Sequence, residues 1–256
     1  MEYQQMEEHI ISKAIIETYT EQLISHLDVD AAIAGAGPSG LVCAYYLACR
    51  GLKVAVFERH LKPGGGMPAG GMMFNNIVLQ DEARSVAEEF GITLKEYSGG
   101  LYTADAVEAI SGITFKAVKA GAKVFNLIGV EDVVIREGRV TGVVVNWSAV
   151  DIAKLHVDPL AVRAGTVLDA TGHDSEVCRI VEKKTGSLKV AGEKSMWAEK
   201  GEKALDENTR EVYPGLFVCG MAANAVAGSP RMGAIFGGML LSGKKAAGLM
   251  LKKLRR

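Results

Sequence analysis

A glycine pattern within residues 29–59 constrains the fold of this chain more than any other feature. Gly35, Gly37 and Gly40 form G-x-G-x-x-G between the apolar run VDAAIA, which predicts a buried strand, and LVCAYYLACRG, which predicts a helix. The run KVAVFER then predicts a second strand. Together these segments predict a β-α-β unit, the beginning of a parallel sheet.

Each glycine of this pattern has a physical role in a dinucleotide-binding turn. One permits the tight turn, one lets the backbone approach a pyrophosphate, and one lets helix and strand pack closely. A pyrophosphate at the N-terminus of the helix meets free N–H groups and a favourable dipole, and Ser39 adds a hydroxyl there. Glu58 ends the second strand, where it can accept hydrogen bonds from an adenosine ribose, and Arg59 follows it in the same predicted site. A glycine turn used only for packing is the alternative, and the surrounding strand, helix and acid favour the nucleotide.

The remaining segments predict an α/β fold with an antiparallel β meander. Ile11, Ile15, Tyr19 and Leu23 recur at helical spacing and predict an amphipathic N-terminal helix. No repeat or long linker divides the chain, so we predict a single domain, 1–256, with an inserted β/α lobe at roughly 62–150. The predicted helices are 9–27, 81–91, 103–121 and 233–254, and the predicted strands are a hairpin around EGR within 124–150 and single strands at 164–172 and 213–221.

Composition and charge exclude some classes of function. The 256 residues carry 29 basic and 30 acidic side chains, and this balance does not indicate a nucleic-acid partner. No apolar run reaches the length of about 20 residues that a membrane span needs. The N-terminus has Glu2, Glu7 and Glu8 where a secretory signal would be basic, so we expect a cytoplasmic protein without a membrane partner. The cysteines are scattered and are expected to be buried apolar residues: Cys43, Cys49, Cys178 and Cys219.

Two short stretches bring together metal-binding residue types. LHVDPL contains His156 and Asp158, and ATGHD, which follows soon after, contains His173. Imidazole and carboxylate are suitable ligands for a divalent first-row metal. A histidine after a strand is nevertheless often structural, and an aspartate before proline commonly forms a turn. The residues alone leave both interpretations open.

The identity of the dinucleotide also stays open at this level. Flavoproteins with this layout usually have a late strand that runs into Gly-Asp, whose carboxylate helps to hold the flavin. This chain has LFVCGM, with Met221 after the glycine, which weakens the flavin interpretation.

Motifs across most of the chain resemble the thiamine thiazole synthase family. They are DVDAAIAGAGPSGL, FERHLKPGGGMPAGGMMFN, GVEDV, LHVDP, DATGHD and GSPRMGAIFGGMLLSGKKAA. The resemblance implies a glutathione-reductase-like, Rossmann-type fold and a ring-shaped homo-octamer. It also implies a transferase-type reaction that consumes NAD as a substrate, releases nicotinamide, and makes an adenylated thiazole carboxylate from NAD, glycine and a sulfur source.

One departure within LHVDP indicates the source of sulfur. The eukaryotic branch of the family has a cysteine where this chain has His156, and that cysteine gives up its sulfur in a single turnover. The chain therefore resembles the archaeal branch, which uses free sulfide and Fe(II) and turns over repeatedly.

The resemblance also implies roles for individual residues. Asp158 and His173 match the metal positions, which can come from neighbouring subunits, and His156 is expected to contact the bound intermediate or sulfide. Arg231, in GSPRMG, is expected to hold the carboxylate of glycine. The remaining residues expected to line the ligand are Gly66, Val130, His156, Val157, Asp158 and Met221.

Three alternatives to this function use the same fold. They are a small flavin-dependent oxidoreductase, a sugar-phosphate isomerase, and a nucleotide-binding scaffold without chemistry. A scaffold would keep the glycine pattern but would not need His156, Asp158 and His173 together.

Overall fold

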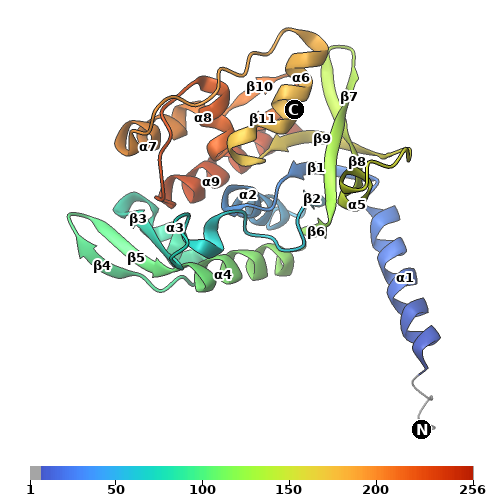
Figure 1. Ribbon diagram of the computed structural model, residues 1–256, viewed down its shortest axis with the longest axis horizontal. Helices are drawn as coiled ribbons and strands as arrows, with labels where there is room; N and C mark the ends of the chain where they lie inside the picture. Colours follow the sequence, from blue (N-terminus) through green and yellow to red (C-terminus); the bar gives the residue numbers. More distant parts are fainter. Residues whose placement is uncertain (1–6, 256) are drawn as a thin grey trace.

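An eight-stranded mixed sheet forms the centre of the computed structural model, which describes residues 7–255 (Figure 1). Its five parallel strands lie in the order β11-β9-β1-β2-β6, so the predicted β-α-β unit is confirmed at the middle of the sheet. These strands are β1 (Asp28–Ala34), β2 (Val54–Glu58), β6 (Lys123–Asn126), β9 (Leu160–Asp169) and β11 (Leu216–Val218). A short antiparallel strand, β10 (Glu211–Tyr213), forms the edge next to β11.

The predicted hairpin around EGR is confirmed as β7 (Ile128–Arg136) and β8 (Arg139–Trp147). Glu137 and Gly138 connect the two strands with φ of 50° and 72°, a left-handed turn that matches the twist of the flanking strands. β8 also pairs antiparallel with the first half of β9, whereas the second half of β9 pairs parallel with β1. The long strand β9 therefore joins the antiparallel meander to the parallel sheet.

Helices α2 (Pro38–Ala48) and α9 (Gly237–Leu254) pack closely against each other beside the central strands. Gly243 permits this approach, because a Cβ atom there would lie only 2.4 Å from the carbonyl oxygen of Ser39. The last predicted helix, 233–254, is confirmed as α9 but begins four residues later than expected. The other helices of the C-terminal half are α5 (Ser148–Ile152), α6 (Glu176–Thr185), α7 (Ala198–Asn208) and α8 (Met221–Ala227).

A separate three-stranded antiparallel sheet lies within the predicted lobe, in the order β3-β5-β4. The helix predicted at 103–121 begins only at Ala106, because the preceding residues form β5 and the carboxylate of Asp105 caps the helix by accepting from Val107 N–H and Glu108 N–H. The helix predicted at 81–91 is a short 3₁₀ turn, η2, followed by one short helix, α3. The elements of this region are η1 (Met67–Ala69), β3 (Asn76–Gln80), η2 (Asp81–Ala83), α3 (Arg84–Glu89), β4 (Lys95–Ser98), β5 (Leu101–Asp105) and α4 (Ala106–Lys119).

The N-terminal helix α1 (Glu8–Ser25) extends away from the rest of the molecule (Figure 1). Near its C-terminal end, Tyr19 packs edge-on against Phe125 with ring centroids 6.2 Å apart. Ile11 and Ile15 are 46% and 63% exposed, and the helix has no buried residue. The helix itself is confirmed, but of its predicted apolar residues only Tyr19 and Leu23 pack against the core of this chain. In the part of the chain that the structure describes, no helix is long and apolar enough to cross a membrane.

Candidate functional site

The glycine turn between β1 and α2 has the geometry that the pattern predicts. Gly35 has φ of +97°, and a Cβ atom there would lie 2.5 Å from the carbonyl oxygen of Ala170. A Cβ atom at Gly40 would lie 2.3 Å from the carbonyl oxygen of Gly35. Both contacts are with backbone atoms, which cannot move aside, so these two glycines are required for the fold.

Gly37 differs from the other two glycines of the turn. Its φ is −72°, which other residues adopt readily, and a Cβ atom there would meet nothing within 4 Å. Gly37 is also the N-cap of α2, and no side chain caps this helix N-terminus. The space beside Gly37 is therefore open to an anion that the free N–H groups would bind.

The glycine-rich loop that follows β2 folds back onto this turn. The N–H of Gly64 donates to the carbonyl oxygen of Ala36 at 2.7 Å, and a Cβ atom at Gly65 would lie 3.4 Å from the Cα of Gly37. Gly66 has open space where its side chain would be. The loop thus brings its backbone next to the turn, as expected for a ligand-lining segment.

Ser39 is 5% exposed, and its hydroxyl donates to the sulfur of Met239 at 3.6 Å. The hydroxyl thus faces the contact between α2 and α9 and not the open side of the turn. The expectation that this hydroxyl lies at the phosphate site is corrected here, because close packing of the two helices turns the side chain inward. Only the backbone N–H of Ser39 remains to contact a ligand.

Glu58 is 5% exposed at the end of β2, and it ties the turn together. Its Oε2 accepts from the N–H of Ala36 at 2.9 Å, and its Oε1 accepts from the N–H of His60 at 2.9 Å and lies 2.8 Å from His60 Nδ1. A carboxylate has about four acceptor positions, so Glu58 can still accept from a ribose hydroxyl. Sequence reasoning missed His60, although its position two residues after the ribose-binding acid could have indicated it.

Arg59 links the end of β2 to the loop after β9. Its guanidinium pairs with the carboxylate of Glu176 and lies 3.8 Å from that of Asp174. Burial raises the pKa of the Glu176 carboxyl, and the charge of Arg59 opposes that shift. Val130 on β7 is half-buried. It lies near Arg59, because a Cβ atom at its neighbour Gly129 would lie 3.7 Å from the Cβ of Arg59.

A buried carboxylate organises the DATGHD turn. Asp169 is fully buried at the end of β9, and it accepts from the N–H and hydroxyl of Thr171 at 3.0 and 2.6 Å and from the N–H of Cys178 at 2.9 Å. These bonds fix the 3₁₀ turn η3 (Gly172–Asp174), which carries His173. The His173 side chain is 47% exposed, and its Nδ1 lies 2.7 Å from Glu193 Oε2.

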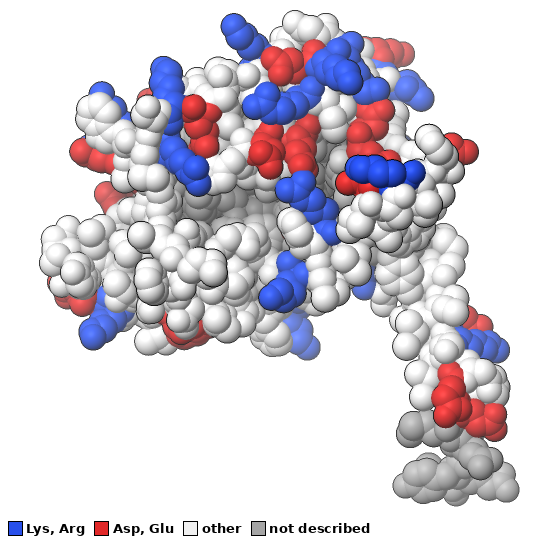
Figure 2. Space-filling model, in the orientation of Figure 1, with Lys and Arg blue, Asp and Glu red and all other residues white. Residues whose placement is uncertain are grey.

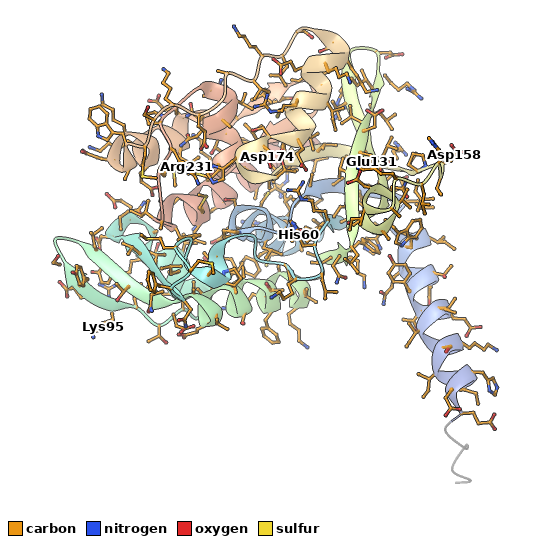
Figure 3. All side chains as sticks on the ribbon, viewed as in Figure 1. His60, Lys95, Glu131, Asp158, Asp174 and Arg231 are labelled. Atoms are coloured by element: carbon orange, nitrogen blue, oxygen red, sulfur yellow. The ribbon has the colours of Figure 1, made fainter. Side chains whose placement is uncertain are left out.

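Arg231 lies on the same side of the molecule as Asp174 and His60 (Figure 3). Its backbone is fixed, because its N–H donates to Lys194 O and its carbonyl accepts from Trp197 N–H at 3.0 Å. Its exposed guanidinium makes no ion pair with any residue from 7 to 255. It is therefore available to a carboxylate of a ligand.

Met221 begins α8 directly after Gly220, whose φ is 58°. It is 6% exposed, so it takes part in the core next to the predicted ligand region. The position at which flavoproteins usually have an acid is thus apolar and buried in this chain.

His156, Val157 and Asp158 lie in the exposed loop between α5 and β9. A hollow of about 280 Å³ beside this loop is lined by Glu131, Asn146, Val150, Asp151, Lys154, Leu155, His156 and Val157.

Figure 3 shows that Asp158 lies far from Asp174, and therefore from the adjacent His173, with the β7–β8 hairpin between them. Among the described residues, no three potential ligands form a metal-binding group. Closeness in sequence thus does not bring Asp158 and His173 together within one chain.

Figure 2 shows that the surface is hollowed between the part that contains α6, α7 and α8 and the part that contains β3–β5 and α4. Acidic and basic side chains gather along the rim on the side of α6, α7 and α8. The carboxyl ends of the parallel strands carry the glycine turn, Glu58 and His173, which is where open α/β sheets bind ligands.

Comparison with known proteins gives full-length matches. Residues 12–236 match the Thi4 family. The thiamine thiazole synthase of Methanothermobacter thermautotrophicus is 56% identical over 251 residues, which cover 96% of this chain and 97% of the relative. The thiamine thiazole synthase of Pyrococcus horikoshii is 54% identical over 250 residues, which cover 98% and 99%. The crystal structure of Thermovibrio ammonificans THI4 is 52% identical, has a TM-score of 0.96, and is matched over 99% of this chain and 100% of that chain.

Proposed function

The chain belongs to the Thi4 family, and from this premise we propose that it is a thiazole synthase that makes an adenylated thiazole carboxylate from NAD, glycine and free sulfide with Fe(II). The observation that carries the proposal is the near-complete match, above 50% identity, to thiamine thiazole synthases. The fold is that of a glutathione-reductase-like, Rossmann-type dinucleotide-binding protein with an antiparallel meander. The enzyme therefore belongs to thiamine biosynthesis, and the proposal concerns its substrates.

The geometry supports NAD and glycine as two of these substrates. The open space beside Gly37 admits a pyrophosphate, and Glu58 lies where it can accept from the adenosine ribose. The free guanidinium of Arg231 has the planar fork that binds a carboxylate with two parallel hydrogen bonds. We propose that Arg231 holds glycine by its carboxylate at the nicotinamide end of the dinucleotide.

The donor set fits Fe(II). His173 presents an exposed imidazole whose Nδ1 is already bound by Glu193, and Asp158 presents an exposed carboxylate. Imidazole and carboxylate suit divalent iron, and two protein ligands leave positions for substrate atoms. When bound there, Fe(II) would supply Lewis acidity and a site for sulfide.

The separation of Asp158 and His173 supports a site shared between subunits of a homo-oligomer, which we propose to be an octamer. The exposed isoleucines of α1 support the same conclusion, because an unburied apolar helix gains stability only when another surface covers it. These side chains are Ile10, Ile11, Ile15, Ile16 and Ile24.

The residues of the chain supply binding, orientation and proton transfer for the proposed steps. Nicotinamide leaves the ribose, the exposed sugar isomerises to a ketose, glycine condenses with it, and sulfide adds before the ring closes with loss of water. Most of these steps move protons on carbon and oxygen, for which a histidine is suited near neutral pH. His156, exposed beside Asp158, is the proposed proton carrier when its loop faces a neighbouring subunit.

The complete reaction tests this proposal. Under anaerobic conditions with NAD, glycine, sulfide and Fe(II), we expect an adenylated thiazole carboxylate and an equal amount of nicotinamide, both measured by mass spectrometry. Omitting any one substrate should abolish the thiazole. Nicotinamide formed from the complete mixture without any thiazole would instead identify an NAD hydrolase, and a flavin absorbance of the purified protein would identify the oxidoreductase alternative.

Gly37 provides a second test, directed at the nucleotide. Gly37→Ala places a methyl group in the open space without a clash in the protein, so folding should be unchanged and NAD affinity should fall at least about tenfold, about 1.4 kcal/mol. Calorimetry measures the affinity, and thermal unfolding measures the stability. Gly248→Ala is the matched control, because it also adds a methyl group into open space but lies on α9. Unchanged NAD affinity in Gly37→Ala would show that the pyrophosphate does not bind at this turn.

A further inference from the structure

The hydrogen bond between His173 and Glu193 joins an exposed ring to a shielded carboxylate. The two side chains are 47% and 13% exposed, and the Nδ1–Oε2 distance is 2.7 Å. The ring is therefore anchored at Nδ1, and its other edge remains accessible.

Main-chain bonds fix the position of Glu193 independently of its side chain. Gly192 N–H donates to Ala225 O at 2.9 Å, and Lys194 N–H donates to Ser229 O at 3.0 Å. Lys194 also forms an isolated β-bridge with Pro230, next to Arg231. The segment that carries Glu193 is thus held between the end of α8 and the loop of the proposed glycine clamp. A substitution of the side chain leaves these bonds intact.

The carboxylate has one partner where a structural carboxylate usually has more. Within residues 7–255, Glu193 Oε1 is buried and has no hydrogen-bond partner. A shielded carboxylate with an unsatisfied oxygen is unfavourable for stability. Asp169, in the same region, shows the structural alternative, because both of its oxygens accept hydrogen bonds from the turn that it stabilises. The contact of Glu193 with His173 is thus poorly explained by stability alone.

Other charged groups near His173 are engaged elsewhere. The side chain of Asp174 faces Arg59, at 3.8 Å, and its carbonyl oxygen accepts from Arg179 Nε at 2.9 Å. Glu193 is therefore the group that determines which nitrogen of the ring carries the proton.

We infer that Glu193 is a positioning residue that holds His173 in the Nδ1–H tautomer, so that the lone pair of Nε2 is free to bind the metal. An ionised carboxylate can only accept, so the bonded Nδ1 must carry the hydrogen, and the neutral ring then has its lone pair on Nε2. Carboxylates that orient metal-binding histidines in this way typically contribute 10–100-fold to metal affinity. That His173 binds a metal rests on the proposed function, whereas the tautomer of its ring does not depend on that function.

The tautomer can be measured without metal. Solid-state ¹⁵N NMR of histidine-labelled, metal-free protein at alkaline pH distinguishes protonated from unprotonated ring nitrogens, and His173→Gln identifies the signals of His173. We expect a protonated Nδ1 and an unprotonated Nε2 in the wild type. In Glu193→Ala, water replaces the carboxylate and the Nε2–H tautomer should become the major form. A wild-type His173 with its proton on Nε2 would overturn the inference, even if Glu193→Ala does not fold.

Metal affinity separates this inference from the proposed function. Titration of the assembled protein with Co(II), followed by its visible absorption, should show about 10–100-fold weaker binding in Glu193→Ala. Glu199→Gln is the matched control, because it also removes a carboxylate, one that pairs at the surface with Lys203, and its affinity should not change. A tautomer change with unaltered Co(II) affinity would support the positioning role and contradict His173 as a metal ligand. An unaltered tautomer in Glu193→Ala would overturn the positioning role.

Discussion

Asp158→Ala and His173→Ala are each expected to abolish thiazole formation, and assembly of both variants in one oligomer is expected to restore it. Loss of a ligand to a Lewis-acid metal removes several kcal/mol of transition-state stabilisation, so each variant should lose activity at least about 1,000-fold. Because the two residues lie far apart in one chain, a mixed interface can pair an intact Asp158 from one subunit with an intact His173 from its neighbour. Random assembly should restore about one quarter of the sites, and therefore of the activity.

Co-expression of the two variants with different affinity tags, followed by tandem purification, isolates the mixed oligomers for this assay. The control is the double variant co-expressed with His173→Ala, in which no interface can have an intact His173. If Asp158 and His173 act within the same chain, the mixed oligomer stays as inactive as each parent. Absence of any oligomer in sedimentation would contradict the shared site directly.

The central fold could be predicted from sequence because its signals are local. Gly35 has a positive φ, and a Cβ atom at Gly40 would meet the carbonyl oxygen of Gly35 in the same turn. The buried runs of β1, β2 and β9 are short and apolar. The EGR hairpin was predictable for the same reason, since its turn needs only two residues with positive φ. In each case the pattern and the structure that it stabilises lie in one segment.

The small sheet could not be predicted in this way. β4 is fully exposed and β5 is mostly half-buried, so neither has the alternating apolar pattern that indicates a strand. The sequence assigns residues 103–105 to the following helix, because only the cap at Asp105, visible in three dimensions, separates strand from helix. Ser39 shows the same limit, since the position of Met239 on a distant helix decides where its hydroxyl points.

The candidate site was predictable in its parts but not in its assembly. Motif residues such as Glu58 and His173 lie at the carboxyl ends of neighbouring strands, as the fold requires. The partner of His173 is Glu193, twenty residues later in an irregular segment, and no local pattern identifies such a pair. The relation between Asp158 and His173 depends on how subunits assemble, which is a property of surfaces such as α1.

The environment of the cysteines indicates that the protein retains its cysteine sulfur atoms through many turnovers. Cys43, Cys178 and Cys219 are buried, and burial raises the pKa of each thiol, so these side chains stay protonated and weakly nucleophilic near neutral pH. Cys49 is exposed, but it follows the C-terminal end of α2, about 16 Å of helix from the glycine turn. No cysteine is thus both reactive and near the site, and position 156 is a histidine.

With excess sulfide and Fe(II), we therefore expect more than one product molecule per subunit and an unchanged intact mass of the protein afterwards. Cys49→Ser should retain full activity, because the one exposed thiol takes no part in the reaction. A cysteine that donated its sulfur would become dehydroalanine, and the protein would lose about 34 Da, the mass of one hydrogen sulfide molecule. Such a loss, with product limited to one per subunit, would show that a cysteine of this chain is the source of the sulfur and that free sulfide is not.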